Sequence, residues 1–361
     1  MPADKNKTRV LLIKTGALGD VVRTTSVLSG LAARYGEGLE LEWLTAPEAR
    51  PLLDGLVGPS GPIARMWTVL PDAFDELGDE LVARGFDRVL SFDDERALCA
   101  VATRVAGGPD AVEARVLGAY LDATGERRYT DSAKEWFDMG LLSVHGKAEA
   151  DRLKIQNRAT HPAIFARMLG IAVGEPQLVL PPAVLDAGRA RLSGFESAGA
   201  QIGLNTGAGG RWPSKALPEE RVVQLAVELT RRLDPKPRLV LLGGPEESRR
   251  QKRLAAGLEA AGLEFLDSGC DNSLLEFAAL VDGLDLIVTS DSLALHLATA
   301  RRVPTVAFFA PTSAAEIELY GRGLKVTSTA PDACSYAPNA DTASLTVERL
   351  AAAVEQALPR R

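Results

Sequence analysis

The chain has 361 residues, of which 46% are hydrophobic and 25% charged, and its formal net charge is −7 at pH 7. This length predicts two domains, because a domain usually holds about 100–200 residues. The acidic balance argues against a nucleic-acid partner, which requires a clustered basic footprint to meet phosphates.

The cysteines and the apolar runs limit where the protein works. Cys99, Cys270 and Cys334 are odd in number and far apart, so we expect neither a disulfide framework nor a zinc knuckle. The apolar run at 10–13 is too short for a signal peptide, and no run approaches the roughly 18 residues of a membrane span. We expect a cytoplasmic protein without a transmembrane segment, and peripheral membrane contact stays open.

In the first half of the chain, short β-branched runs alternate with longer helical patterns, which is typical of βαβ units and a parallel sheet. The predicted elements are strand 9–14, helix 20–35, and strands 39–45, 65–70 and 87–92. Residues 117–161 show no clear period but carry Tyr129, Lys134, Trp136, Phe137 and Lys147. This segment is either part of an acceptor site or a mobile surface insertion.

The second half repeats the alternation, with strands predicted at 201–206, 237–243, 263–268, 284–290 and 303–309 and a helix opening at Pro218. The Pro181-Pro182 pair suggests a domain boundary. The sequence therefore predicts an α/β protein with two Rossmann-like domains, at 1–180 and 181–345, followed by a C-terminal helix at 346–361.

The first candidate loop is KTGALGD (14–20), where the first strand gives way to a helix. Ligands of open α/β sheets bind at this edge, and Gly16 and Gly19 let backbone amides approach them. The spacing fits neither the dinucleotide fingerprint nor the P-loop. Asp20 is equally well interpreted as a helix N-cap and as a catalytic carboxylate.

The second candidate loop is NTGAGGRWPSKALPEE (205–220). Its glycines expose amides, while Arg211 and Lys215 supply cations, so the loop suits a pyrophosphate. The alternative is a turn with a packed tryptophan, and for Trp212 itself that interpretation is preferred.

The third candidate loop is TSDSLALHLATA (289–300). Asp291 and Ser292 lie at a strand end, and His296 lies about one helical turn beyond Ser292 on the same face. A helix cap and a structural histidine are the plainer explanation. The segment APTSAAE (310–316) then follows the next strand, so four loops are expected at one rim.

The order of these motifs is similar to glycosyltransferase family 9, the ADP-heptose:lipopolysaccharide heptosyltransferases. It runs K-T-x-x-x-G-D, R-W-P, D-S-x-x-x-H, P-T-S and then Tyr320-Gly321. The resemblance covers residues 9–35 and 200–358, whereas 107–165 matches poorly.

The resemblance implies a GT-B fold with two Rossmann-like domains facing a central cleft, the first holding the acceptor and the second the nucleotide-sugar. It implies an inverting, metal-independent enzyme without a cofactor. That enzyme would move a sugar, such as the heptose of ADP-heptose, to a hydroxyl of a glycan, lipid-linked or small-molecule acceptor. The sequence also lacks the D-x-D triplet that holds a metal in the other common fold for this chemistry.

Carried over by position, Asp20 corresponds to the general base and Lys14 to the basic residue of the same loop. The donor is expected to meet Thr206, Arg211, Lys215, Glu246, Asp291, Ser292, His296 and Thr312. The acceptor side is expected to include Gly16, Gly19, Lys134 and Trp136.

Four departures from the family pattern imply a reshaped donor pocket. Gly210 stands where a lysine is usual, Leu293 replaces a glycine, Ala310 replaces another, and Cys334 is left from a cysteine pair. The leaving diphosphate then depends on Arg211 or Lys215.

Two other functions compete with this one. A nicotinamide-dependent oxidoreductase is disfavoured because no G-x-G-x-x-G follows a predicted strand. A catalytically degenerate nucleotide-sugar-binding protein is suggested by the altered donor glycine.

Overall fold

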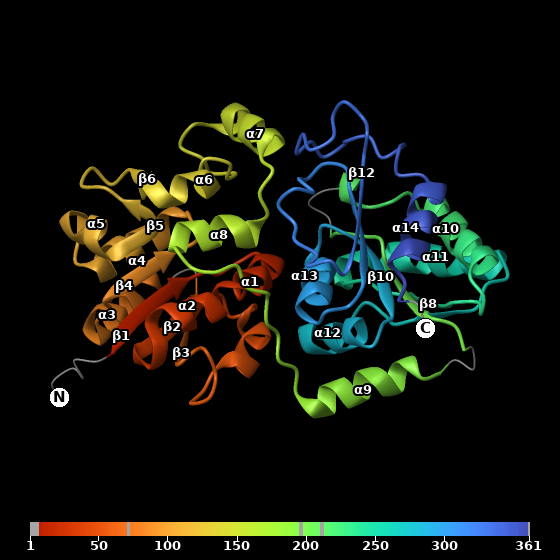
Figure 1. The fold of residues 1–361 in the computed structure, drawn as a ribbon, viewed down its shortest axis with the longest axis horizontal. Coiled ribbons are helices and arrows are strands. Elements are labelled where there is room, and N and C mark those ends of the chain that lie inside the picture. The colour runs from red at the N-terminus through yellow and green to blue at the C-terminus, as the bar shows by residue number, and fades with distance from the viewer. Residues whose placement is uncertain (1–6, 71–72, 195–197, 210–212, 360–361) are drawn as a thin grey trace. The chain divides into compact units, whose positions relative to one another are not determined.

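A computed structural model describes residues 7–70, 73–194, 198–209 and 213–359. The chain forms two compact units, Met1–Val179 and Leu180–Arg361. Each unit is a sheet covered by helices (Figure 1), as the α/β prediction requires.

The sheet of the first unit has six strands in the order β3-β2-β1-β4-β5-β6. Its pairs are parallel except for the edge strand β6, which runs antiparallel to β5 and departs from the predicted all-parallel sheet. The strands are β1 (Thr8–Ile13), β2 (Leu39–Thr45), β3 (Arg65–Thr68), β4 (Arg88–Ser91), β5 (Val116–Leu121) and β6 (Arg127–Tyr129). The helices are α1 (Leu18–Thr24), α2 (Val27–Tyr35), α3 (Phe74–Arg84), α4 (Arg96–Ala106), α5 (Val112–Arg115), α6 (Lys134–Phe137), α7 (Lys147–Gln156) and α8 (His161–Leu169).

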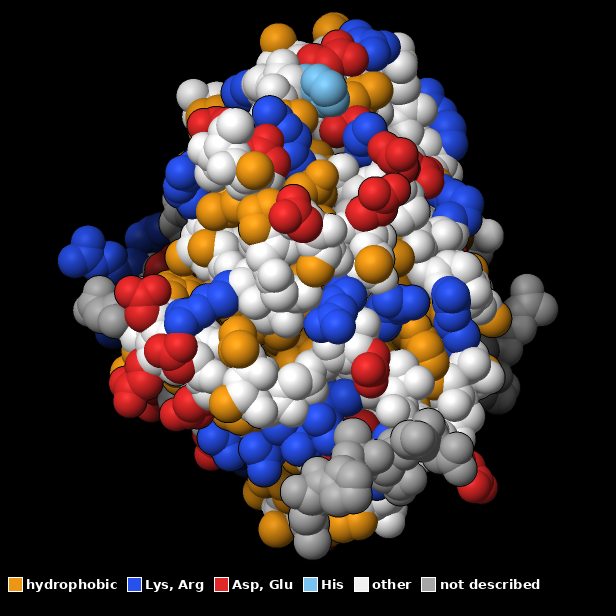
Figure 2. All heavy atoms as spheres, turned by 90° about the vertical axis from the view of Figure 1, so that its left-hand side faces the viewer, with side chains coloured by type: hydrophobic (Ala, Val, Ile, Leu, Met, Phe, Trp, Pro, Cys, Tyr) orange, Lys and Arg blue, Asp and Glu red, His pale blue; other side chains and the backbone are white. Residues whose placement is uncertain are grey.

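Strand β1 is the centre of this unit. Val10 and Leu12 belong to one hydrophobic core and Leu11 and Ile13 to another, because successive side chains point to opposite faces of the sheet. Helices cover both faces of the sheet, so side chains on both faces are buried and the strand sequence is a continuous apolar run. The unit's outer surface carries both charge signs, with Lys and Arg gathered in a band toward the lower end of the view in Figure 2.

The sheet of the second unit has six strands, all parallel, in the order β12-β11-β10-β7-β8-β9. The strands are β7 (Gln201–Asn205), β8 (Arg238–Leu241), β9 (Phe265–Asp267), β10 (Leu286–Ser290), β11 (Thr305–Phe309) and β12 (Gly323–Thr327). The helices are α9 (Pro182–Leu192), α10 (Glu219–Arg232), α11 (Ser248–Ala260), α12 (Leu274–Asp282), α13 (Leu293–Ala300) and α14 (Val347–Ala357).

Helix α14 packs within the second unit, and its expected return to the N-terminal domain stays a prediction. Its apolar residues Leu350, Ala351 and Val354 are buried in the core of the second unit, and the helix packs beside α10 and over β11 and β12. An amphipathic helix has one apolar face, and here that face is used within its own unit.

No helix in the described ranges is long and apolar enough to cross a membrane.

Candidate active site

In the first unit, the site is built on two neighbouring strands. Strands β1 and β4 pair in parallel, with Ile13 opposite Ser91, so the residues that follow them meet at one sheet edge. Lys14 Nζ forms an ion pair with Asp93 Oδ1 there. Asp93 Oδ2 accepts hydrogen bonds from the Thr15 backbone N–H and, at 2.8 Å, from Thr15 Oγ1. One carboxylate therefore fixes the start of the KTGALGD loop.

The ammonium of Lys14 is buried but stays charged. Burial by itself lowers its pKa, but the carboxylates of Asp93 and Asp20 outweigh that effect, so the net pKa is raised above 10.5. The Lys14 carbonyl accepts a hydrogen bond from Trp43 Nε1 at 3.0 Å. The residue thus supplies a fixed positive charge beneath the loop.

Asp20 lies in the first turn of α1. The N-cap position is Ala17, so Asp20 is not the cap that one interpretation of the sequence gave it. Its Oδ1 lies 2.9 Å from Nη2 of Arg23, one turn along the same helix. The side chain of Asp20 is 34% exposed and can meet a substrate, while the helix dipole favours its negative charge. Gly19 is buried and Gly16 half-buried in the same loop.

Trp136 joins this group through Arg23, whose guanidinium carbon lies 5.2 Å from the centre of the indole ring. The ring also packs edge-on against His161 and Phe165, with centroids 5.0 and 5.3 Å away. Part of the 117–161 segment therefore lies beside the Asp20 loop. The structure does not bring Lys134 into this group, because its Nζ pairs with the exposed Asp131 at 2.6 Å.

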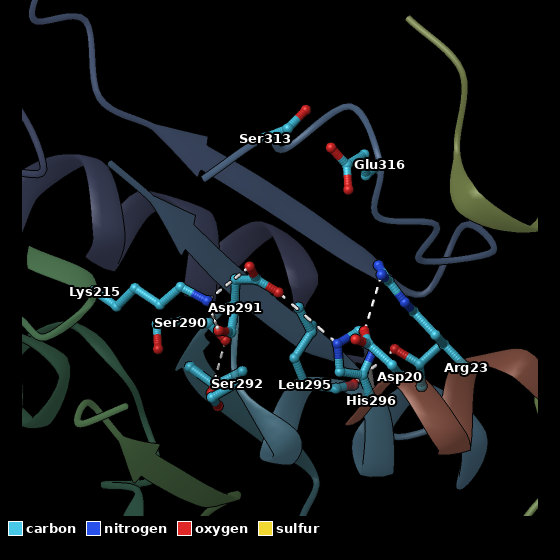
Figure 3. A network of polar contacts seen from close by, with 12 residues as sticks. Asp20, Arg23, Lys215, Ser290, Asp291, Ser292, Leu295, His296, Ser313 and Glu316 are labelled. Atoms are coloured by element: carbon cyan, nitrogen blue, oxygen red, sulfur yellow. Dashed lines mark hydrogen bonds and ion pairs between the residues drawn. The ribbon is translucent and has the colours of Figure 1, made fainter. Parts of the chain in front are cut away.

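In the second unit, Asp291 links the predicted donor residues. Lys215 Nζ donates to the Asp291 carbonyl at 2.8 Å and to Oδ2 at 3.0 Å, and His296 Nε2 lies 3.8 Å from Oδ1. Figure 3 shows Lys215 and His296 reaching Asp291 from opposite sides. The structure thus brings the second and third candidate loops together at one sheet edge.

Ser292 is the N-cap residue of α13, and its hydroxyl accepts a hydrogen bond from Asn205 Nδ2 at 3.2 Å. The same amide donates to Thr289 Oγ1 at 3.1 Å. These contacts tie the ends of β7 and β10 together, so Ser292 has a structural role as well as a position at the site.

Arg250 hydrogen-bonds to Thr206. Its Nη2 donates to Thr206 Oγ1 at 3.2 Å and to the Leu217 carbonyl at 2.5 Å. Burial lowers the pKa of Arg250, although nearby Glu219 and Glu247 act in the opposite direction. An arginine remains charged under these conditions. The 205–209 loop therefore has a partly buried cation beside it.

The carboxylate of Glu247 accepts hydrogen bonds from the backbone N–H groups of Gly209, at 2.5 Å, and Gly244, at 2.6 Å. The predicted nucleoside contact, Glu246, is exposed on the same short 3₁₀ helix, Pro245–Glu247. Because an added Cβ at Gly209 would lie 2.9 Å from Glu246 Oε2, the two residues are close neighbours.

Thr312 follows β11 and is buried, and its Oγ1 has no hydrogen-bond partner within the described ranges. The segment around it is held by the tail of the chain. Tyr336 N–H donates to the Pro311 carbonyl at 2.8 Å, and Ser313 N–H donates to Tyr336 Oη at 3.2 Å. A buried hydroxyl on a fixed loop is a usable ligand group.

Three of the sequence predictions fall outside the described residues. Arg211 and the Gly210 departure lie outside the described residues, as does Trp212. Among the residues that are described, no three His, Cys, Asp or Glu side chains are grouped so that they could hold a metal ion.

Three residues at these sites were not predicted, namely Asp93, Glu247 and Arg250. The signal for Asp93 was present, because FDDE (92–95) follows a strand as the other loops do. Glu247 and Arg250 stand at the start of α11, and only the fold shows that they lie under the 205–209 loop.

The two α/β units are those of a GT-B fold, and solved structures of glycosyltransferases share it. A family 9 glycosyltransferase from Veillonella parvula has a TM-score of 0.72 at 16% identity, covering 97% of each chain. The ADP-heptose lps heptosyltransferase II of E. coli has a TM-score of 0.67 at 19% identity, covering 97% of this chain and 98% of its own. E. coli heptosyltransferase WaaC with ADP-2-deoxy-2-fluoro heptose has a TM-score of 0.58 at 20% identity, covering 97% and 99%.

Residues 163–341 match the family model of glycosyltransferase family 9 (heptosyltransferase). This confirms the resemblance seen in the order of the motifs. No curated protein matches the chain.

Proposed function

We propose that this glycosyltransferase moves a sugar from a nucleotide-diphosphate donor to an acceptor hydroxyl, with inversion at the anomeric carbon and without a metal ion. Asp20 is the general base. Its carboxylate is accessible, stays close to the positive charges of Arg23 and Lys14, and follows the strand-end loop of the family motif. This observation carries the proposal.

In the proposed reaction, Asp20 takes the proton of the acceptor hydroxyl as its oxygen attacks the anomeric carbon. The C–O bond to the diphosphate breaks on the opposite face, and the nucleoside diphosphate leaves with the electron pair. Base assistance of this kind contributes about 10²- to 10⁴-fold to the rate. Lys14 keeps the loop in place and supports the ionised carboxylate.

The donor is assigned to the second unit. Its diphosphate would lie between the 206–209 amides and the start of α13, where free N–H groups favour negative charge. Lys215 and Arg211 would neutralise the leaving group, Asp291 and His296 would position the donor sugar and Lys215, and Thr312 Oγ1 would donate a hydrogen bond. Glu246 is assigned to the nucleoside.

ADP-heptose is the proposed donor, because two structurally similar proteins are heptosyltransferases named with ADP-heptose or an ADP-heptose analogue. A lipopolysaccharide-core glycan is the first acceptor to test. Trp136, beside Arg23, is assigned to the acceptor side. We place the reaction in the cytoplasm, with which the three free cysteines agree.

The test is a panel of nucleotide-sugars, including ADP-heptose and GDP-sugars, with NAD as a negative control. Transfer to an acceptor, or slow donor hydrolysis without one, supports the proposal. Tight donor binding without any turnover would instead identify a degenerate binding protein, and a thermal shift with NAD alone would favour an oxidoreductase.

A further inference from the structure

A cavity of about 510 Å³ lies at the N-terminal end of the sheet in the first unit. Thr8 opens β1, Arg88 opens β4, and Arg115 directly precedes β5, so the cavity lies at the starts of three neighbouring strands. Lys14 and Asp93 follow the opposite ends of β1 and β4. The cavity is therefore separate from the site described above.

Four cations line this cavity, namely Lys7, Arg34, Arg88 and Arg115, and all four are exposed. In the part of the chain that the structure describes, none of them forms an ion pair. Neighbouring like charges repel, so this cluster is an uncompensated excess of positive charge in a chain of net charge −7.

A nearby arginine outside the cavity has acidic partners, which distinguishes it from the four lining cations. The nearby Arg84 pairs with Glu40 and Glu42. The only acidic residue of the cavity wall, Asp87, accepts the backbone N–H of Arg9 at 2.8 Å. The lining therefore has three more positive than negative charges. Lys and Arg side chains gather on this side of the unit (Figure 2).

The arginines are partly fixed in place. Arg34 Nη1 donates to the Leu169 carbonyl, and its guanidinium lies over the ring of Tyr35, 5.7 Å from the centroid. Arg88 Nη1 donates to the Ala114 carbonyl. Each guanidinium has five N–H donors, so several remain for a ligand. Val89 pairs with Val116 across β4 and β5, so Arg88 and Arg115 precede the same register position and lie close together.

We propose that this cavity binds a phosphate-bearing group. Planar guanidinium groups match phosphate oxygens in pairs, and a cavity of this size admits a small phosphorylated molecule or headgroup. The source is either a soluble phosphate compound or the headgroup of an anionic phospholipid. The cavity and the Lys14–Asp93 pair lie at opposite ends of strands β1 and β4, so the proposal does not depend on the assignment of the catalytic loop.

The experiment measures binding to the full chain at low salt, with inorganic phosphate as one probe and phosphatidylglycerol vesicles as the other. In the double variant Arg88→Ala/Arg115→Ala, the Kd for the bound probe should rise at least about tenfold, because two charge-assisted contacts are lost. Arg152→Ala removes a paired, exposed cation of the same unit and should change the Kd less than about twofold. ADP is added at a saturating concentration so that it occupies the proposed donor loop and phosphate cannot bind there.

Phosphate binding that depends on Arg88 and Arg115 identifies a soluble ligand, and vesicle binding alone that depends on them identifies a headgroup. Equal binding by all variants, or no binding of either probe by the wild type, overturns the proposal. A second measurement separates binding from a structural role. Relief of repulsion should leave the Tm of ligand-free Arg115→Ala unchanged or higher, whereas a structural role predicts a fall.

Discussion

Asp93→Asn should destabilise the first unit strongly, because it removes the carboxylate that pairs directly with buried Lys14 and leaves only the more weakly interacting Asp20. The two side chains are 11% and 5% exposed, respectively. Breaking such a buried pair costs about 3–5 kcal/mol. For a unit of this size, each 1 kcal/mol lowers Tm by roughly 2–4 °C. The expected loss in Tm is therefore roughly 6–20 °C, measured by calorimetry.

The pH dependence adds a second readout. The pKa of Lys14 is raised above 10.5 in the folded chain, so its stabilising contribution is complete below 10.5 and is lost as the pH rises through the folded value. In Asp93→Asn the Asp93 carboxylate no longer raises the pKa of Lys14, so burial lowers that pKa relative to the wild type. The stabilising contribution of Lys14 should therefore be lost at a lower pH. The matched control is Asp75→Asn, an exposed carboxylate in the first turn of α3. Equal Tm values for Asp93→Asn and this control would refute the reasoning.

Three further predictions concern the donor, the acceptor and the thiols. Arg211→Ala should weaken ADP binding by about 1.5–3 kcal/mol in calorimetry, since a charge-assisted contact is lost; a larger loss in Lys215→Ala would reverse the assignment within this loop. Trp136→Ala should raise the acceptor KM and leave donor affinity unchanged, and the opposite pattern would place Trp136 on the donor side. Burial raises the pKa of Cys99 to about 12, so iodoacetamide at pH 8 should label Cys99 only after unfolding; rapid labelling of the folded chain would contradict this.

The sequence predicts the strands that are short apolar runs, but it misses β5, β6 and β12. The predicted strand 9–14 corresponds to β1, Thr8–Ile13. The predicted helix 20–35 is instead divided into α1 and α2 at Thr25 and Ser26. Thr25 Oγ1 donates to the Val22 carbonyl and accepts the Gln177 N–H, and a contact across 152 residues gives no local signal.

The sites were predicted where one loop carries its own motif and missed where partners come from distant segments. Asp20 and Asp291 follow from strand-end position, but the Lys14–Asp93 pair joins residues 79 positions apart. It can be inferred only once the β1–β4 register is known. The basic cavity is a similar case, since its four cations are scattered between residues 7 and 115 and form no cluster in the sequence.

The proposed mechanism depends most directly on Asp20, and the decisive measurement is sugar transfer by Asp20→Asn. The partly exposed pair with Arg23 is worth about 1 kcal/mol or less, so the Tm should change little and donor binding should persist. Turnover should fall at least about a hundredfold, while Asp75→Asn remains active. A folded Asp20→Asn variant that transfers sugar at near wild-type rate would contradict the mechanism.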